Sequence, residues 1–168
     1  MESELFKLAE QLGCSLKASG KIIAVAESCT GGWIAQVITD VPGSSAWFDR
    51  GFVSYSNAAK VQMLGVKQQT LDDYGAVSAE TATEMAAGVL AHSDADVAVA
   101  VTGIAGPDGG TPEKPVGTVF IAWVEKSNGV RVDKKQFAGN RLQIRAQTVK
   151  HAIDGVFCLL ADVTHKQS

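Results

Sequence analysis

The sequence predicts a single-domain α/β protein, a layered α/β/α sandwich with a mixed sheet. Three observations predict this fold class. Apolar stretches of strand length alternate with helical periodicity, and the 168 residues suffice for one domain over 1–168. VGTVFIAWV and VRVDKKQFA flank EKSNG, whose Asn128 and Gly129 can adopt positive φ, which predicts an antiparallel hairpin. Small polar or glycine-rich segments follow three apolar stretches directly, as at the carboxyl edge of α/β sheets.

The chain opens with a helix, a strand and a second helix. Leucines recur at helical spacing between Ser3, which can cap a helix, and Gly20, which can end one, so we expect a helix over 3–19. The apolar run IIAVA predicts a strand over 22–26. GGWIAQVIT at 31–39 then predicts a helix that starts after a turn and ends before a Pro-Gly loop.

The next segment is expected to hold a strand and two short helices. RGFVSYS is rich in β-branched and aromatic residues and predicts a strand ending near Tyr55. Asn57 can cap a helix that runs through Met63, so Lys60 falls in the first turn of that helix. TLDDYG predicts a helical turn that stops at Gly75.

The second half is expected to contain a packed helix, a central strand and a loop. Ser78 can cap a helix over AETATEMAAGVLAHS, and DVAVAVTG is typical of a strand covered on both faces. The segment 103–115 holds four Gly and three Pro and is predicted to be a loop. After the hairpin, whose second strand reads as an edge, a last helix should run from about Arg141 to Val163.

The last helix carries an apolar seam at a spacing near 3.5 residues. This seam can pack on the sheet or on a second subunit. Its members are Leu142, Ala146, Val149, Ile153, Val156 and Leu160.

Composition argues against several classes of function. A net charge of −3 without a long Lys or Arg run disfavours nucleic-acid binding and favours a small-molecule partner. The cysteines, Cys14, Cys29 and Cys158, and the three histidines are scattered without metal-ligand spacing, so we expect no metal and no disulfide framework. No apolar stretch reaches about 18 residues and the N-terminus is acidic and helical, so we expect a cytoplasmic protein with no membrane partner.

Three segments that follow strands, ESCTGG, SYSNAAK and TGIAGPDGG, are expected to line one cleft. In the first, Ser28, Cys29 and Thr30 compete for the role of nucleophile, while Gly31 and Gly32 allow backbone N–H groups to approach an oxyanion or a phosphate. Plain helix capping explains the same residues. The segment has neither a P-loop, nor a dinucleotide fingerprint, nor an esterase elbow.

The second segment sets Tyr55 and Lys60 five residues apart. A lysine in the first turn of a helix faces the positive end of the helix dipole, which lowers its pKa and makes it a better base for a serine. The alternative is an ordinary surface lysine beside a half-buried tyrosine.

The third segment and the last helix offer anion-binding groups. Thr102 and the glycine-rich loop can supply backbone donors and a lid, although such loops are often only flexible. Arg141 and Arg145 lie one turn apart near a helix N-terminus, where a bound phosphate would relieve their conflict with the dipole. The alternative is that both arginines pair with nearby acids.

Three strings then identify a family. AESCTGGWIAQVITDVPGSSAWFDRGFVSYSNAAKVQMLGV, GAVSAETA and TGIAGPDGGTPEKPVGTV closely resemble the C-terminal domain of the competence-damage inducible CinA family, in its stand-alone nicotinamide-nucleotide amidase form. The resemblance runs from about Ala26 to Val119 and implies a CinA C-terminal-like fold for the whole chain. Longer CinA proteins carry an N-terminal domain, which we expect to be missing here with its activity.

The resemblance implies hydrolysis of nicotinamide mononucleotide to nicotinate mononucleotide and ammonia, in pyridine-nucleotide salvage, without metal or cofactor. Ser28 would attack, Lys60 would serve as base, and Tyr55 would relay the proton or orient the lysine. Backbone N–H groups at Thr30 to Gly32, or at Thr102 and Gly103, would hold the oxyanion. The candidates for the ribose phosphate are Gly43, Ser44, Ser45 and Arg145, with Arg141 as an alternative to Arg145, and Cys29 is the alternative nucleophile.

Two other functions remain open at this point. A non-catalytic phosphate or nucleotide sensor would use the same cleft without depending on Lys60. An interaction module linked to competence or DNA damage is disfavoured for direct DNA contact by the net charge of −3. From the family and the seam of the last helix we expect a homodimer.

Overall fold

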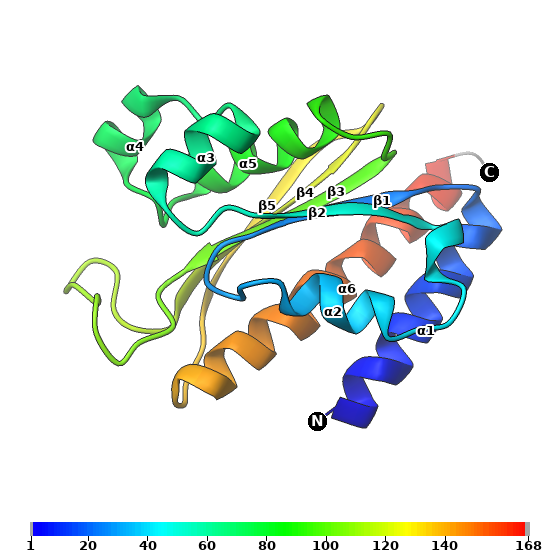
Figure 1. The fold of residues 1–168 in the computed structure, drawn as a ribbon, viewed down its shortest axis with the longest axis horizontal. Coiled ribbons are helices and arrows are strands. Elements are labelled where there is room, and N and C mark those ends of the chain that lie inside the picture. The colour runs from blue at the N-terminus through cyan, green and yellow to red at the C-terminus, as the bar shows by residue number, and fades with distance from the viewer. Residues whose placement is uncertain (1, 167–168) are drawn as a thin grey trace.

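The computed structural model describes residues 2–166, with the side chains of residues 3–161, and has a sheet between two helical layers (Figure 1). The predicted α/β sandwich is confirmed. Its helices are α1 (Glu2–Ser19), α2 (Trp33–Thr39), the 3₁₀ turn η1 (Ser44–Ala46), α3 (Asn57–Leu64), α4 (Gln68–Tyr74), α5 (Ala79–Ala91) and α6 (Arg141–Lys166).

The five strands form one mixed sheet in the order β2-β1-β3-β4-β5. The first three strands of the chain run parallel. Strand β4 is antiparallel to both of its neighbours, and together with β5 it forms the predicted hairpin. The carboxyl ends of β1, β2 and β3 therefore lie together at one edge of the sheet. The strands are β1 (Ile23–Glu27), β2 (Phe48–Val53), β3 (Val97–Gly103), β4 (Thr118–Glu125) and β5 (Gly129–Gln136).

Two apolar cores flank the sheet. On one face α1, α2 and α6 pack over large side chains such as Trp47 and Trp123, and on the other α3, α4 and α5 pack over the alanines of β1 and β3. Small residues there bring α5 close to the sheet. At Gly88, an added Cβ would lie 2.0 Å from the Leu64 carbonyl oxygen, so only glycine fits between α5 and α3.

The apolar seam of α6 packs inside this chain. Val149, Ile153 and Val156 are buried in the core shared with α1 and the sheet, whereas Leu142 is 54% exposed. The seam is therefore not available to a second subunit, and the homodimer stays a prediction that rests on the family alone.

The structure differs from the prediction at three boundaries, two helix starts and one strand end. Helix α1 begins at Glu2, so Ser3 lies inside it, and the N-cap of α3 is Ser56, whose hydroxyl accepts from the Ala59 N–H, rather than Asn57. Strand β2 ends at Val53, two residues before Tyr55. In each case a neighbouring residue competes for the same boundary, which a sequence pattern locates only to within a few residues.

Other boundaries agree with the sequence. The Ser78 hydroxyl accepts from the Thr81 N–H at the start of α5, and Gly20 ends α1 at φ 65°. Gly75 ends α4 as predicted. Within the described residues, no helix has the length and apolar character needed to span a bilayer.

Candidate active site

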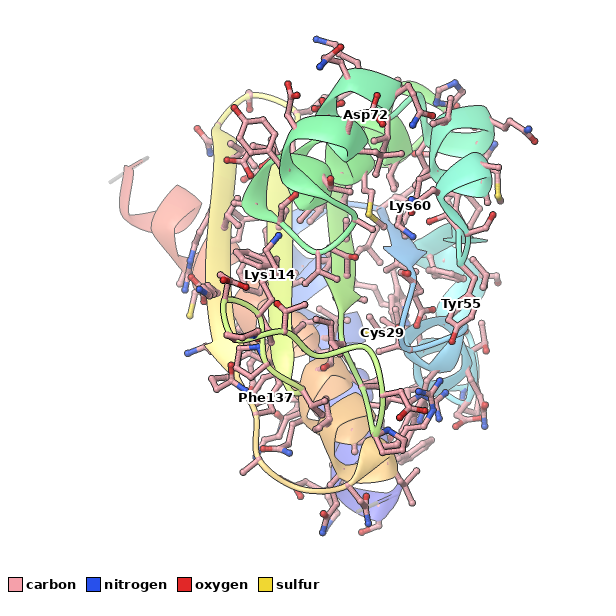
Figure 2. The ribbon with its side chains drawn as sticks, turned by 90° about the vertical axis from the view of Figure 1, so that its left-hand side faces the viewer. Cys29, Tyr55, Lys60, Asp72, Lys114 and Phe137 are labelled. Atoms are coloured by element: carbon pink, nitrogen blue, oxygen red, sulfur yellow. The ribbon has the colours of Figure 1, made fainter. Side chains whose placement is uncertain are left out.

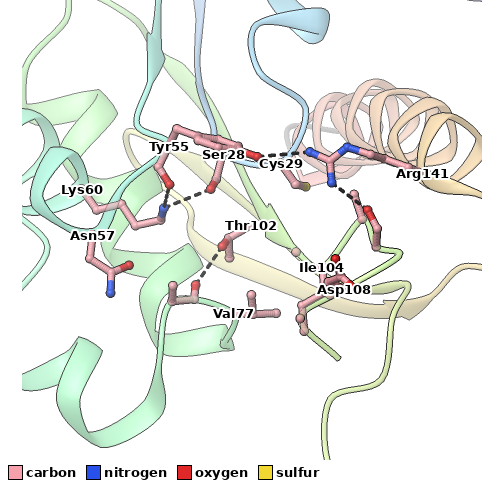
Figure 3. A pocket seen from close by; sticks show the side chains of 15 residues that line it. Ser28, Cys29, Tyr55, Asn57, Lys60, Val77, Thr102, Ile104, Asp108 and Arg141 are labelled. Carbon is pink, nitrogen blue, oxygen red and sulfur yellow. Dashed lines mark hydrogen bonds between the residues drawn. The ribbon is translucent and has the colours of Figure 1, made fainter. Parts of the chain in front are cut away.

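The carboxyl ends of the three parallel strands open into one pocket of about 280 Å³ (Figure 3). The three segments singled out in the sequence all contribute to it, as expected. Its lining residues are Ser28, Cys29, Tyr55, Asn57, Lys60, Ala76, Val77, Thr102, Gly103, Ile104, Ala105, Gly106, Asp108, Gly109 and Arg141.

Ser28 and Lys60 meet at the base of this pocket. The Lys60 Nζ lies 3.0 Å from the Ser28 Oγ, 2.8 Å from the Ser54 carbonyl oxygen and 3.2 Å from the Tyr55 carbonyl oxygen. A neutral amine has two N–H groups and one lone pair. If the N–H groups donate to the two carbonyls, the lone pair is left to accept the Ser28 hydroxyl proton, which is the arrangement that a general base needs.

Lys60 is buried, with 1% of its surface exposed. Burial lowers the pKa of its amine from the ordinary value, because the charged form loses its hydration. No carboxylate among the residues described pairs with it. The reading of Lys60 as an ordinary surface lysine is therefore wrong, and the residue is suited to act as a base.

Cys29 also faces the pocket, next to Ser28. Burial raises the pKa of its thiol to about 11, because the thiolate would lose its hydration there. A thiol with this pKa stays protonated near neutral pH and is a poor nucleophile. The Ser28 hydroxyl, in contrast, lies 3.0 Å from the Lys60 amine.

Glu27 holds the turn that carries Ser28, a role that the sequence did not reveal. Its buried carboxylate accepts from the Thr30 hydroxyl at 2.6 Å and from the N–H groups of Ile34 and Ala35 at 2.8 and 3.1 Å. Gly32, the N-cap of α2, has no side chain to do this. Capping thus comes from the residue before the turn rather than from Ser28 or Thr30, so Ser28 is free for Lys60.

Gly31 and Gly32 make the tight turn possible. Both have positive φ, 60° and 102°, a conformation that residues with a Cβ rarely adopt. The N–H groups of Thr30 and Gly32 donate to no acceptor in the part of the chain that the structure describes. They are free donors in the turn that follows Ser28, although neither residue lines the Ser28 pocket.

The two arginines of α6 lie above this turn and pair with no acid among the described residues. Arg145 donates to the carbonyls of Cys29 and Thr30 at 3.0 and 3.1 Å, and its guanidinium lies 5.4 Å from the centre of the Trp33 ring. Arg141 donates to the Gly106 carbonyl at 2.8 Å and to the Tyr55 hydroxyl at 3.2 Å. Only Arg141 lines the Ser28 pocket, and both line a second hollow beside it.

Tyr55 is 60% exposed, and its two ends reach different groups. Its backbone carbonyl accepts from Lys60, and its side-chain hydroxyl accepts from Arg141. Tyr55 therefore lines the pocket between the lysine and the arginine (Figures 2 and 3). The hydroxyl makes no hydrogen bond with Ser28 or Lys60.

Thr102 and Gly103 form part of the pocket wall. The Thr102 hydroxyl donates to the Ala76 carbonyl at 2.8 Å and joins β3 to the segment between α4 and α5. A Cβ on Gly103 would lie 2.7 Å from Val119 Cγ2, so a side chain does not fit there.

The structure does not bring Gly43, Ser44 and Ser45 to this pocket. Helix α2 leads away from the carboxyl edge, and these residues precede β2 at the amino-terminal end of the sheet, where the Trp47 carbonyl accepts from the Ile23 N–H. The prediction assigned them to the ribose phosphate on the family resemblance. The parallel pairing of β1 and β2 requires that turn to lie a full strand length from Ser28.

Two further polar residues of the pocket belong to the predicted segments but were not singled out as site residues. Asn57 lines it from the first turn of α3, and Asp108 lines it from the loop between β3 and β4. Asn57 was interpreted as a cap, and Asp108 was not distinguished from the rest of its glycine-rich loop. Across the residues that the structure describes, no group of three or more His, Cys, Asp or Glu side chains is arranged to hold a metal.

Comparison with known proteins gives the family. The family model described as the CinA C-terminal domain matches residues 5–160. This chain belongs to the CinA C-terminal domain family. Among its relatives, the nicotinamide-nucleotide amidohydrolase PncC of Enterobacter agglomerans is 57% identical over 87% of this chain and 89% of its own, and that of Escherichia coli K12 is 53% identical over 90% and 92%.

Solved structures agree with this membership. The competence/damage inducible protein CihA from Agrobacterium tumefaciens superposes with a TM-score of 0.90 at 46% identity, covering 92% of this chain and 94% of its own. A CinA superfamily protein from Klebsiella pneumoniae superposes with a TM-score of 0.91 at 34% identity, covering 94% and 98%. The family fold therefore extends over nearly the whole domain.

Proposed function

We propose that this CinA family member is a nicotinamide-nucleotide amidase that hydrolyses the carboxamide of nicotinamide mononucleotide to nicotinate mononucleotide and ammonia. The observation that carries the proposal is the 3.0 Å contact between Ser28 Oγ and the buried Lys60 Nζ. The names of the relatives at 57% and 53% identity support the same substrate.

In the proposed mechanism Lys60 accepts the Ser28 proton as the Oγ attacks the amide carbon. The tetrahedral intermediate then collapses, and Lys60 returns the proton to the departing nitrogen, which leaves as ammonia. A water molecule, deprotonated by the same amine, attacks the acyl-serine ester. Lys60 then passes this proton to the departing Ser28 Oγ, and the carboxylate is released. The carbonyls of Ser54 and Tyr55 keep the amine aimed at Ser28 throughout.

Backbone donors would stabilise the oxyanion. One candidate source of these donors is the turn after Ser28, where the N–H groups of Thr30 and Gly32 are free. The other is β3, through the backbone of Thr102 and Gly103. Donors of this kind need no proton transfer and are held in place before the reaction begins.

The ribose phosphate is assigned to Arg141. This arginine lines both the Ser28 pocket and the neighbouring hollow of about 330 Å³, and it has no acidic partner in the described chain. Arg145 faces the same hollow but does not line the Ser28 pocket, and it donates to the carbonyls of the turn that carries Ser28. Its primary role is to position that turn.

The test is ammonia release from nicotinamide mononucleotide by metal-stripped protein in chelator, for wild type, Ser28→Ala and Cys29→Ala, with folding checked by circular dichroism. We expect wild type and Cys29→Ala to be active and folded Ser28→Ala to lose about 10³-fold or more in kcat. An inactive wild type that still binds the nucleotide would make the protein a sensor. An active Ser28→Ala would exclude the serine mechanism.

We also expect a cytoplasmic location, from the lack of a long apolar stretch, and a homodimer, from the family resemblance. Light scattering after size-exclusion chromatography measures the assembly, and a monomer at micromolar concentration would remove this expectation.

A further inference from the structure

Asp108 is the sole carboxylate among the described residues that line the Ser28 pocket. It lies on the loop between β3 and β4, opposite Lys60 in the view of Figure 3. Its carboxylate makes no hydrogen bond or ion pair with any residue that the structure describes, although Lys60 and Arg141 line the same pocket. The loop is held at both ends of this segment, because Arg141 donates to the Gly106 carbonyl and Lys114 donates to the Tyr74 carbonyl.

The proposed substrate carries two opposite charges. Its phosphate is negative, and its pyridinium ring, which bears the reacting carboxamide, is positive. With the carboxamide at Ser28 and the phosphate at Arg141, the ring occupies the pocket between them. A positive ring there is repelled by Arg141, and an unpaired carboxylate in the same pocket offsets that repulsion.

We propose that Asp108 recognises the positive charge of an N-ribosylated pyridinium, so that the pocket selects the oxidised ring over its neutral dihydro form. This inference rests on the proposed function, because it concerns the ring of the same substrate. Asp108 acts on binding and holds no proton of the reaction, so it determines specificity rather than the chemical step.

The same loop supplies a matched control. Glu113 is exposed, carries the same charge and does not line the pocket. The substitutions Asp108→Asn and Glu113→Gln each remove one negative charge at nearly constant shape. A general effect of the protein's net charge changes both variants equally, whereas recognition of the ring changes only the first.

The experiment measures the Kd of nicotinamide mononucleotide and of its dihydro form by calorimetry in the full-length Ser28→Ala background. We expect Asp108→Asn to weaken binding of the cationic ring about fivefold at low salt, less at high salt, and to leave the neutral ring within about twofold. Glu113→Gln should change neither. Equal weakening of both ligands, no change in either, or no binding of the mononucleotide at all would overturn the inference.

Ammonia release by the wild type tests the proposed function separately. Binding that depends on Asp108 without ammonia release would refute the amidase and keep the role of Asp108. Ammonia release together with an unchanged preference in Asp108→Asn would keep the amidase and refute that role.

Discussion

At the amino-terminal ends of the parallel strands, charged side chains pair with each other, whereas at the carboxyl ends they do not. Lys21 pairs with Glu125, and Arg50 lies 2.9 Å from Asp49. At the other edge Lys60 contacts only the Ser28 hydroxyl and two carbonyls.

The arginines and Asp108 extend the contrast. Arg141 and Arg145 donate to carbonyls and to one hydroxyl, and the Asp108 carboxylate has no partner among the described residues. An ion pair inside the protein neutralises charge that a ligand could otherwise meet. The amino edge uses its charges for stability, and the carboxyl edge keeps them for a substrate.

The largest effect should come from replacing one lysine at each edge of the sheet with methionine. Lys60→Met removes the base and should lower kcat/KM for the nucleotide about 10³-fold or more. Lys21→Met leaves Glu125 without its partner and should lower the free energy of unfolding by about 1–3 kcal/mol while activity changes less than about twofold. Ammonia release and urea denaturation measure the two effects, and a large activity loss in Lys21→Met would break the comparison.

Unlike Asp108, the Glu27 carboxylate at the carboxyl edge accepts three hydrogen bonds, so substituting it should affect both stability and activity. Glu27→Ala leaves the buried Thr30 hydroxyl and the Ile34 N–H without an acceptor. We therefore expect the free energy of unfolding to fall by about 3 kcal/mol and kcat to fall about 100-fold. Glu27→Gln keeps one acceptor oxygen and should recover much of both. If Gln is as damaging as Ala, the negative charge rather than the hydrogen bonds holds the turn.

The pH dependence follows from the buried amine. Burial lowers the pKa of Lys60 below its usual value of about 10.4, and the base must be unprotonated, so kcat/KM should rise about tenfold per pH unit up to that lowered pKa and then level off. Between the lowered pKa and about 10.4 the unfolded chain binds the proton more tightly, so the free energy of unfolding relative to Lys60→Met should rise with pH.

A pH–rate profile and urea denaturation at several pH values check the two parts. Activity that is independent of pH from 6 to about 10 would show that the rate does not depend on this amine.

A smaller effect is expected from a matched pair of arginines. Arg141→Gln removes the charge assigned to the phosphate and should raise KM about tenfold with little change in kcat. Arg50→Gln removes an arginine of the amino edge that already pairs with acids, and should leave KM unchanged. Initial rates over a range of substrate concentrations give KM and kcat for both variants. A fall in kcat alone for Arg141→Gln would show that Arg141 does not bind the phosphate.

The smallest effect is expected at Cys29. Since the pKa of its thiol is about 11, iodoacetamide at neutral pH should not inactivate the protein, and Cys29→Ala should keep kcat within about threefold. Rapid inactivation that Cys29→Ala prevents would return the thiol to the list of nucleophiles.

The sequence predicted the site best where a residue's neighbours along the chain decide its position. Ser28 follows β1 and Thr102 lies at the carboxyl end of β3, and the parallel pairing of these strands brings the two ends together, so both could be placed at one edge from the pattern. Gly31 and Gly32 similarly indicate a turn without reference to the rest of the fold.

Residues whose roles depend on distant partners were not predictable in this way. Glu27 was only the first residue of the polar segment after the predicted strand, yet it caps α2 because the turn folds back over it. Gly43, Ser44 and Ser45 were assigned to the ribose phosphate on the family resemblance, yet the path of α2 carries them to the far edge.

The sequence by itself determined the layered α/β class, the hairpin, most helix ends and three segments that could carry chemistry, because periodicity, capping and turn preferences act over a few residues. Tertiary structure alone decided the strand order, the burial that lowers the pKa of Lys60, the choice of Arg141 for the pocket and the unpaired state of Asp108. Desolvation and charge pairing depend on what lies nearby in space, and here those neighbours come from segments up to 116 residues apart.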